Sequence, residues 1–448
     1  MTRPLGAGYR TLFGASVISN LGDGVGLIAY PWLASALTRS PLLIAAVGVA
    51  QRLPWLVFTL PAGVITDRVD RQRLMVLANA ARAVLTALLA VAVLVRSGTI
   101  PAPDEIDGVV GTTWSLYLAV IVATVLAGTA EVLYDNSAQT FMPAIVEPAE
   151  LERANGRLYS AELVANQFLG PPLASLLLAT GFLLPILVDA GSFAVSAALV
   201  ASISGLRRAS RAAPALDAAG ARPSWRAELA EGFRWLWHHD LIRTFAVALG
   251  CLNLLGAMGQ AVLVLYGQEV LHTTVLEFGL LSTGVAAGGV LGGWSASAIT
   301  RRIGSGRSVG LTLWVGGIGA LAVGLVSQWV VVAVLFGVTM FVAVLWNVIT
   351  VSLRQTVIPD RLLGRVNSVY RFFGWGAIPI GTLLGGGLVA VLDGPLSREW
   401  ALRAPWLVAG AAQLLLAAVV AGTLTSERID AARAAGARDE PVDAPDGA

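Results

Sequence analysis

The residues best suited to chemistry in this sequence are a few ionisable side chains inside long apolar stretches. Asp23 lies about twelve residues into the first stretch, and Arg52 lies about eleven residues into the second. Twelve residues of helix span ~18 Å, which places both side chains near the middle of a membrane. Ionised groups are costly at that depth, so both residues are candidates for binding an ion or a ligand.

Asp23 is the leading candidate for a proton-coupling residue. Protonation neutralises a carboxylate in the membrane, whereas a neighbouring arginine favours the ionised form. We expect Arg52 to be that arginine, because the first two stretches are neighbours in the chain. Gly22, Gly24 and Gly26 surround the aspartate and allow another helix to approach closely. The alternative is a buried ion pair with a purely structural role.

Other ionisable residues lie in the third to sixth stretches. Glu131 and Asp135 are one turn apart near the inner end of the fourth, and Glu162 lies near the inner end of the fifth. These acids could line an acidic cytoplasmic vestibule or could be solvated charges at helix ends. Asp189, in the outer half of the sixth stretch, is a second candidate for proton binding. Arg82, in the third, is expected to pair with a neighbouring acid or to extend toward the membrane surface.

The elements that must position these residues are membrane-spanning helices. Of the 448 residues, 56% are hydrophobic and 13% are charged, and the mean hydropathy is +0.74. A soluble domain carries about 25% charged residues, so an ordinary soluble enzyme is excluded. The apolar blocks are continuous rather than alternating, which favours helices over the strands of an outer-membrane barrel. About twelve spans are predicted, at 11–37, 41–65, 74–96, 113–134, 158–179, 181–204, 243–267, 275–299, 309–327, 329–352, 370–392 and 401–423.

The placement of arginine predicts how these spans are oriented. If both termini are cytoplasmic, 24 of the 30 arginines fall in inside segments, and four (Arg39, Arg96, Arg398 and Arg403) fall in outside segments. Cytoplasmic loops of membrane proteins are enriched in basic residues. We therefore expect a multi-pass protein of the cytoplasmic membrane with an even number of spans and with both termini inside.

Several kinds of site are excluded or disfavoured by residue types that are absent or rare. There is no lysine, so a phosphate-binding loop of the type G-x-x-x-x-G-K-[ST] cannot occur. A single cysteine, Cys251, and three histidines allow no internal disulfide and argue against a metal site. No nucleophile and base are clustered at one depth. We expect no catalytic residues, no cofactor, no metal, and no nucleotide or nucleic-acid partner.

The two halves of the chain repeat. Residues 65–69 (Ile-Thr-Asp-Arg-Val) recur as residues 299–303 (Ile-Thr-Arg-Arg-Ile), and Asn20 recurs as Asn253 at nearly the same offset. Such repeats indicate two six-span halves around a central site. Asn20 and Asn253 could hydrogen-bond across a central cavity, or they could simply pack between spans. The predicted domains are an N-terminal half at 1–205, a cytoplasmic linker at 206–242, a C-terminal half at 243–424 and a disordered cytoplasmic tail at 425–448.

The linker is predicted to contain an amphipathic helix at the inner membrane surface. Trp225, Leu229, Phe233 and Leu236 fall on one helical stripe, opposite Glu231. The alternative is a simple extension of the seventh span.

A motif after the second span resembles a known signature. Residues 63–73 read Gly-Val-Ile-Thr-Asp-Arg-Val-Asp-Arg-Gln-Arg and resemble the loop G-x-x-x-D-R-x-G-R-[RK] of the major facilitator superfamily. Gly63, Asp67, Arg68 and Arg71 match this pattern, Asp70 replaces a glycine, and Arg73 supplies a base one place later. The resemblance implies an all-α integral membrane fold with twelve transmembrane helices in two pseudo-symmetric six-helix halves.

The same resemblance implies a conformational latch formed by Gly63, Asp67, Arg68, Arg71 and Arg73. In family members the loop aspartate meets the inner end of a helix in the other half of the protein. The helix that begins near Tyr370 is the expected partner here, since a carboxylate is favoured at a helix N-terminus. The alternative is a charge cluster that only holds the loop inside.

Stretches 130–146, 151–155 and 357–368 look like the branch that contains enterobactin exporters and macrolide efflux pumps. This branch implies a secondary transporter in the lipid bilayer that exports hydrophobic or amphipathic small molecules (drugs, siderophores or similar) by proton antiport and alternating access. Gly170-Pro171-Pro172, which predicts a kink in the fifth span, partly resembles an antiporter motif. We expect a monomer. The alternatives are an importer or a lysolipid transporter of the same fold and, more remotely, an intramembrane enzyme; substrate, direction and coupling ion stay open.

Overall fold

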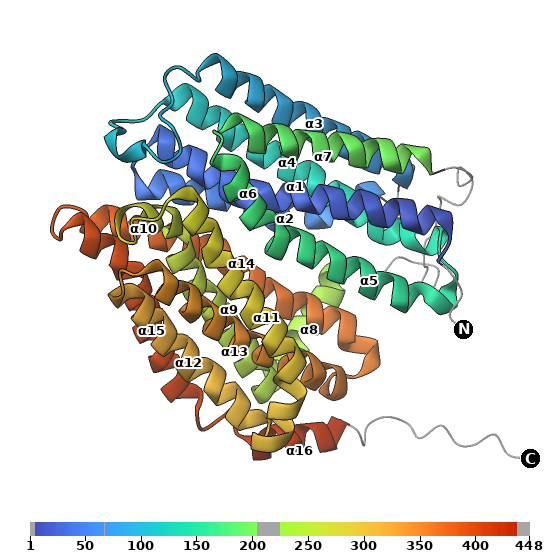
Figure 1. Cartoon of the computed structure of the whole chain (residues 1–448). Coiled ribbons are helices and arrows are strands. Elements are labelled where there is room, and N and C mark those ends of the chain that lie inside the picture. The colour runs from blue at the N-terminus through green and yellow to red at the C-terminus, as the bar shows by residue number, and fades with distance from the viewer. Residues whose placement is uncertain (1–4, 67, 204–224, 437–448) are drawn as a thin grey trace, which may run out of the picture. The chain divides into compact units, whose positions relative to one another are not determined.

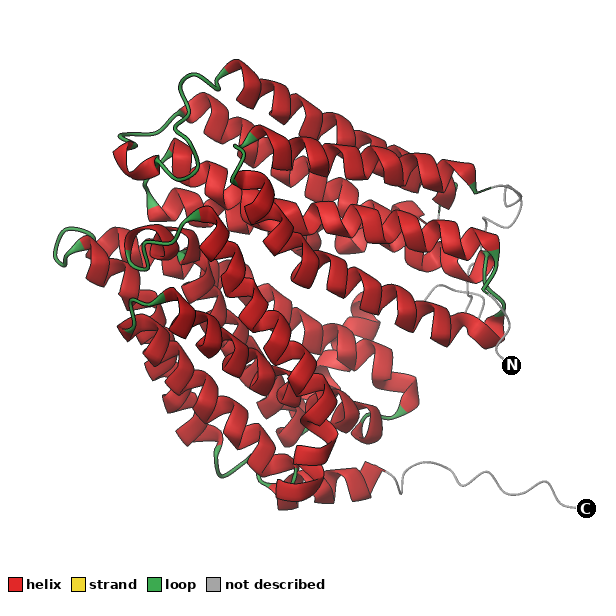
Figure 2. Ribbon diagram, in the orientation of Figure 1, coloured by secondary structure: helices red, strands yellow, loops and turns green. Residues whose placement is uncertain are grey.

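The computed structural model describes residues 5–66, 68–203 and 225–436, and these parts of the chain are helical, with no β-strand (Figures 1 and 2). The first helices are α1 Ala7–Leu37, α2 Pro41–Thr66, α3 Arg71–Val95, α4 Trp114–Phe141, α5 Leu151–Leu163, α6 Gly170–Leu178 and α7 Leu183–Ser202. The later helices are α8 Trp225–His238, α9 Asp240–Ala261, α10 Leu263–Glu269, α11 Val275–Ile303, α12 Ser305–Leu325, α13 Trp329–Val357, α14 Asp360–Leu392, α15 Arg398–Val420 and α16 Ser426–Gly436.

Within the described residues, eleven helices are long and apolar enough to cross a membrane. The remaining predicted span, at 158–179, is interrupted: α5 runs into a π-helical segment at Val164–Leu169, and α6 follows at Gly170. Each piece alone is shorter than the ~20 residues that a spanning helix needs. The helical membrane architecture predicted from the apolar blocks is confirmed.

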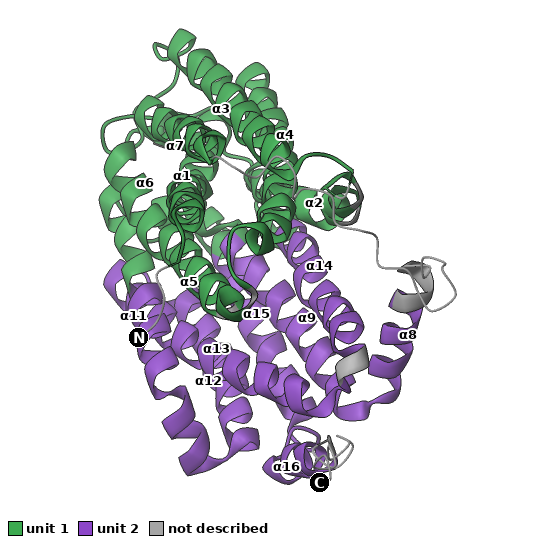
Figure 3. Ribbon diagram, turned by 90° about the vertical axis from the view of Figure 1, so that its right-hand side faces the viewer, with its two compact units in different colours: residues 1–214, 261–283, 385–402 green, residues 215–260, 284–384, 403–448 purple. Residues whose placement is uncertain are grey.

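The chain forms two compact units (Figure 3). Unit 1 comprises residues 1–214, 261–283 and 385–402, and unit 2 comprises residues 215–260, 284–384 and 403–448. In unit 1, α3 packs against α4 and α7, α2 packs against α4, and α1 contacts α7 and α6. In unit 2, α12 packs against α13, and both contact α16. The units differ from the predicted halves because two short later segments pack with the first helices.

Each unit contains an apolar core. In unit 1 the buried residues include Tyr9, Met75 and Phe141, and in unit 2 they include Phe245 and Trp346. Because lipid tails are as apolar as these side chains, the helices are held together by close packing and by polar contacts rather than by the hydrophobic effect alone. The few polar groups inside the units therefore need specific partners.

The tail predicted to be disordered from residue 425 begins with a helix, so this part of the domain prediction is wrong. Ile429 of α16 is fully buried in the core of unit 2. Arg433 donates a hydrogen bond to Ser305 Oγ at 2.9 Å. The Ala-, Asp- and Arg-rich composition suggested disorder, but one buried isoleucine and its polar neighbours suffice to dock the helix. Residues 437–448 lie outside the described residues.

The linker helix is a separate element. α8 ends at His238 and α9 begins at Asp240, so α8 is not a continuous extension of the seventh span. The preceding residues, 204–224, lie outside the described part of the chain.

Candidate functional site

A buried arginine joins two carboxylates in unit 1. Arg82 of α3 is 2% exposed, and its guanidinium is ion-paired with Asp23 of α1 and, at 3.3 Å, with Glu131 of α4. Trp55 of α2 donates its indole N–H to Glu131 at 3.2 Å. Four helices thus contribute to one polar cluster inside an apolar bundle.

Neighbouring side chains on α3 and α7 hold Arg82 in place. Asn79, one turn before it, donates to Ser196 Oγ of α7 at 2.8 Å and accepts from Arg82 at 3.4 Å. The guanidinium carbon of Arg82 lies 3.8 Å from the centre of the Phe193 ring. Cation–π contacts of this kind are strengthened where water is excluded. The guanidinium therefore keeps partners even when a carboxylate beside it loses its charge.

Asp189 of α7 adds a third carboxylate. It is buried, and its Oδ2 accepts a hydrogen bond from the Tyr30 hydroxyl of α1. Its Oδ1 finds no hydrogen-bond partner in the described part of the chain. Asp189 also interacts electrostatically with Arg82. A buried carboxylate with so few donors is costly when ionised, which suits it to binding a proton or a cation.

We call Asp23, Arg82, Glu131 and Asp189 the central cluster. Three carboxylates and one guanidinium leave a surplus of negative charge when all four are ionised. Asp135, one turn along α4, adds to the negative charge that acts on Asp23. Protons or a cationic ligand can neutralise this surplus, and that exchange is the chemistry the cluster can support.

The predicted pairing of Asp23 with Arg52 is wrong. Arg82 takes that place, and the Arg52 side chain is exposed. The neighbouring Gln51 donates to the backbone oxygen of Gly26 at 3.1 Å, so residue 51 is the one that faces α1. Successive helical residues are rotated by about 100°, which turns Arg52 away from that contact. The expectation that Arg82 pairs with a neighbouring acid is confirmed, although the sequence did not show which acid.

The two repeated asparagines do not contact each other. Asn20 donates to the backbone oxygen of Ser16 in its own helix at 3.0 Å. Asn253 donates to the backbone oxygen of Gly374 in α14 at 2.9 Å. These hydrogen bonds fit the packing alternative given for them above.

Helix α1 crosses the interrupted fifth span beside Asp23. A Cβ on Gly24 would collide with the backbone oxygen of Asn166 in the π-helical segment. A Cβ on Gly170 would collide with the backbone of Gly24. Only glycine fits at either position. The irregular backbone begins at Val164, ahead of the Gly170-Pro171-Pro172 triplet, and π-helical turns often occur at functional sites.

The loop with the signature motif is only partly described. Gly63 lies in the last turns of α2, and Arg68 is exposed in the turn that follows. Asp67 lies outside the described residues, so its role as a latch stays a prediction.

The end of this loop is fastened to α3 and α4. Asp70 caps α3 by accepting the backbone N–H of Arg73 at 2.9 Å. Capping favours an aspartate at this position, where the signature has glycine. Arg71 is buried and donates to the backbone oxygen of Thr140 at 2.8 Å. The first contact caps α3, and the second fastens the start of α3 to the end of α4.

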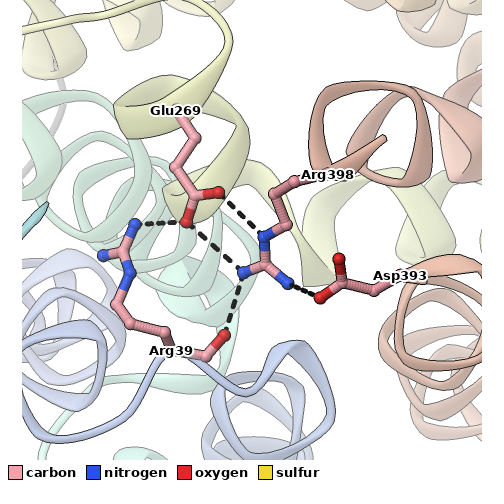
Figure 4. Close-up of a pocket in the computed structure, with 4 residues that line it drawn as sticks. All are labelled: Arg39, Glu269, Asp393 and Arg398. Atoms are coloured by element: carbon pink, nitrogen blue, oxygen red, sulfur yellow. Dashed lines mark hydrogen bonds and ion pairs between the residues drawn. The ribbon is translucent and has the colours of Figure 1, made fainter. Parts of the chain in front are cut away.

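A second arginine–carboxylate cluster lies at helix ends of unit 1 (Figure 4). Glu269, the last residue of α10, is ion-paired with Arg39 of the α1–α2 connection and, at 2.8 Å, with Arg398 at the start of α15. Arg398 also pairs with Asp393 at 2.5 Å and donates to the backbone oxygen of Arg39 at 2.9 Å. The four residues line a cavity of about 390 Å³. We call them the end cluster.

Uncharged contacts reinforce the end cluster. Gln268 accepts from Arg39 at 2.8 Å and donates to Ser35 Oγ at 2.9 Å. Nearby, Trp32 and Phe278 meet edge to face at 4.8 Å. From the sequence, Arg39 and Arg398 were expected only as charges of outside segments. Their common partner, Glu269, could not be identified without the packing of α10 against α1.

Comparison with known proteins now decides the family. A family model of the Major Facilitator Superfamily matches residues 12–382. The chain belongs to this superfamily. The resemblance drawn from the α2–α3 loop is confirmed, as is the all-α membrane fold of this superfamily that it implied.

Relatives and solved structures agree with this assignment. The multidrug efflux pump Tap of Mycolicibacterium fortuitum is 27% identical over 418 residues, which cover 90% of this chain and 93% of that protein. The enterobactin exporter EntS of Citrobacter koseri is 25% identical and covers 86% of each chain. A bacterial homologue of the iron transporter ferroportin in the inward-facing state matches with a TM-score of 0.66 at 18% identity, over 93% of this chain and 100% of that one. The nucleoside transporter NupG matches with a TM-score of 0.65 at 11% identity, over 92% and 98%.

The structural matches show the shared fold alone, because their sequence identities are low. The family model makes this chain a multi-span membrane transporter.

Proposed function

We propose that this major facilitator protein exports hydrophobic or amphipathic small molecules, such as drugs or siderophores, in exchange for protons. The observation that carries the proposal is the central cluster, where Arg82 is ion-paired with two carboxylates and interacts electrostatically with a third. An exchanger needs a buried site whose charge is balanced differently in its loaded and unloaded states. The names of the relatives, a multidrug efflux pump and an enterobactin exporter, support export as the direction.

Helix α1 is the element that would sense protonation. Asp23 and Tyr30 lie seven residues apart, which is two helical turns, so both project from one side of α1. Asp23 binds Arg82, and Tyr30 binds Asp189. Protonation of Asp23 weakens its ion pair and leaves Arg82 to Glu131, whereas ionisation restores the pair. The proton load of the site would thereby change how α1 is held against α3 and α7.

Alternating access requires helix ends to separate on one side of the membrane at a time. The end cluster ties the α1–α2 connection to α10 and α15, and its contacts would break and re-form in each cycle. In the proposed orientation, both termini are cytoplasmic, and the end cluster faces the outside of the inner membrane. The transporter would work as a monomer, without nucleotide, metal or cofactor.

Transport into inverted vesicles tests the proposal. Vesicles with an acidic lumen are supplied with lipophilic drugs, siderophores and lysolipids, and both substrate uptake and proton release are recorded. We expect uptake of at least one drug or siderophore to require the gradient and to release protons from the lumen. Uptake that a protonophore leaves unchanged would refute proton antiport. Gradient-driven loss of substrate from the lumen would identify an importer.

A further inference from the structure

Helix α8 presents an apolar ridge that no part of the transport proposal uses. Leu229, Phe233 and Trp237 are spaced four residues apart, which aligns them on one side of the helix. Their side chains are 42%, 45% and 43% exposed. Large apolar side chains lined up in this way mark a surface that binds a partner or a membrane.

The opposite side of α8 is docked on its own unit, so the direction of the ridge is fixed. Glu231 is ion-paired with Arg365 of α14 at 2.5 Å. A Cβ on Gly232 would lie 2.8 Å from the backbone of Arg365, which shows how closely α8 approaches α14. Leu236 is fully buried in the core of unit 2. These contacts hold α8 on its own unit and leave the ridge side chains more than 40% exposed.

The ridge continues onto a spanning helix. The rings of Phe233 and Trp237 stack at 5.4 Å with an angle of 11°, and they stack on Phe373 of α14 at 6.5 and 6.4 Å. The adjacent Phe372 is 64% exposed. Because α14 is long and apolar enough to cross the membrane, this aromatic surface extends onto a helix that the bilayer surrounds.

Two exposed arginines lie near the ridge. Exposed Arg234 lies on α8, and Arg371 lies at the same end of α14 as Arg365. Of the acids whose side chains the structure describes here, Glu231 pairs with Arg365 and Asp240 pairs with Arg243 at 2.7 Å. The guanidinium of Arg243 also lies 5.8 Å from the Trp237 ring. Tryptophan beside arginine is typical of the membrane interface, and basic side chains attract anionic lipid.

We propose that α8 is a membrane-binding helix whose ridge inserts into the headgroup region of a leaflet rich in anionic phospholipid. An apolar protein partner would cover the ridge but would not explain the arginines that border it. The end of α8 lies one residue from the start of the spanning helix α9, which brings it to the level of the membrane surface. The inference does not rest on the transport direction or on the coupling ion.

Spin labels on single cysteines test this inference, and the chain is suited to them because Cys251 is its sole cysteine. In a Cys251→Ser background, labels are placed on the ridge by Leu229→Cys and Phe233→Cys, and Arg234→Cys and His238→Cys serve as controls outside it. The full-length protein is reconstituted in phosphatidylcholine vesicles with and without phosphatidylglycerol. Collisions with oxygen, which is enriched in lipid, and with a water-soluble nickel chelate are then compared by power saturation.

With phosphatidylglycerol, we expect oxygen collisions to predominate at both ridge positions and nickel collisions to predominate at both controls. Removing phosphatidylglycerol, or substituting Arg234→Gln, should shift the Phe233→Cys label toward nickel. The expected shift in the inserted-to-detached ratio is about fivefold for one arginine, equivalent to ~1 kcal/mol per basic residue near an anionic surface.

Three results would overturn the inference. Nickel collisions that predominate on the ridge in both lipids would show that the ridge is in water. Protection from both reagents would show that another part of a protein covers it. Equal oxygen preference with and without phosphatidylglycerol would remove anionic lipid as the partner. Because no readout measures transport, failure here is distinct from failure of the proposed function.

Discussion

The two arginine–carboxylate clusters of unit 1 contain the same chemical groups but differ in the burial of their arginines and in charge balance. In the central cluster, Arg82 is 2% exposed, is ion-paired with Asp23 and Glu131, and interacts electrostatically with a third carboxylate, Asp189. In the end cluster, two arginines face two carboxylates, and the side chains of Arg39 and Glu269 are each 18% exposed. Breaking a buried ion pair leaves an uncompensated charge, whereas a balanced pair in contact with water separates at little cost. The central cluster is therefore suited to respond to a proton, and the end cluster is suited to open and close.

The largest expected effect comes from removing the central arginine. Arg82→Met leaves Asp23 and Glu131 without their cation, and loss of one partner of a buried pair costs ~3–5 kcal/mol of stability. Thermal unfolding in detergent should show a strongly destabilised protein, and transport should be absent. Adding Asp23→Asn should restore part of the stability, because one of the stranded charges is then removed. A single variant as stable as the wild type would show that Arg82 does not compensate these carboxylates.

Neutralising one carboxylate of the central cluster should abolish the coupling of transport to protons without preventing folding. Asp23→Asn removes a charge with little change in volume and leaves Arg82 paired with Glu131, so we expect intact folding and substrate binding but no gradient-driven efflux. Proton release induced by substrate in reconstituted vesicles is the measurement. Asp189→Asn is the matched variant on the other side of α1. If Asp23→Asn retains wild-type proton release and Asp189→Asn loses it, the proton site is Asp189.

At the end cluster we expect a smaller loss of stability than at Arg82. We also expect this end of unit 1 to become more accessible to reagents from outside. Glu269→Gln should change stability by no more than ~1 kcal/mol, the range for solvated ion pairs. Because Arg39 and Arg398 lose their common partner, that end of unit 1 should open more often. In a Cys251→Ser background, labelling of Ser35→Cys from outside should accelerate several-fold. Glu105→Gln, an exposed acid outside the cluster, is the control; equal acceleration by both changes would contradict the role of Glu269.

The smallest effect is expected for Arg52→Ala. The side chain is exposed, and Asp23 is already paired with Arg82, so stability should change by less than ~0.5 kcal/mol. Proton release and efflux should match those of the wild type at equal expression. Loss of coupling in this variant would show that Arg52 has the role first expected of it and that the pairing of Asp23 with Arg82 does not suffice for coupling.

Much of the architecture could be predicted because membrane constraints act on local sequence. A span requires a continuous apolar run of about 20 residues, so the apolar blocks predicted the helices directly. The arginines between the blocks predicted how these helices are oriented. The cost of charge in a membrane likewise singled out Asp23 and Asp189 before any packing was known, whereas Glu131 was expected only in a cytoplasmic vestibule or as a solvated charge at a helix end. Helix α16 is the exception. Composition alone could not predict it, because burial of Ile429 depends on a surface formed elsewhere in unit 2.

The sequence by itself determined which groups are present and how deep they lie along their helices, whereas only the tertiary structure decided which groups meet. Arg52 and Arg82 are both intramembrane arginines, and nothing local distinguishes the one that reaches Asp23. The end cluster joins residues that are more than 200 positions apart in the chain, such as Arg39 and Glu269. The physical reason is angular: depth follows from counting residues at 1.5 Å each, but pairing depends on how each helix is rotated about its axis, and packing against neighbouring helices sets that rotation.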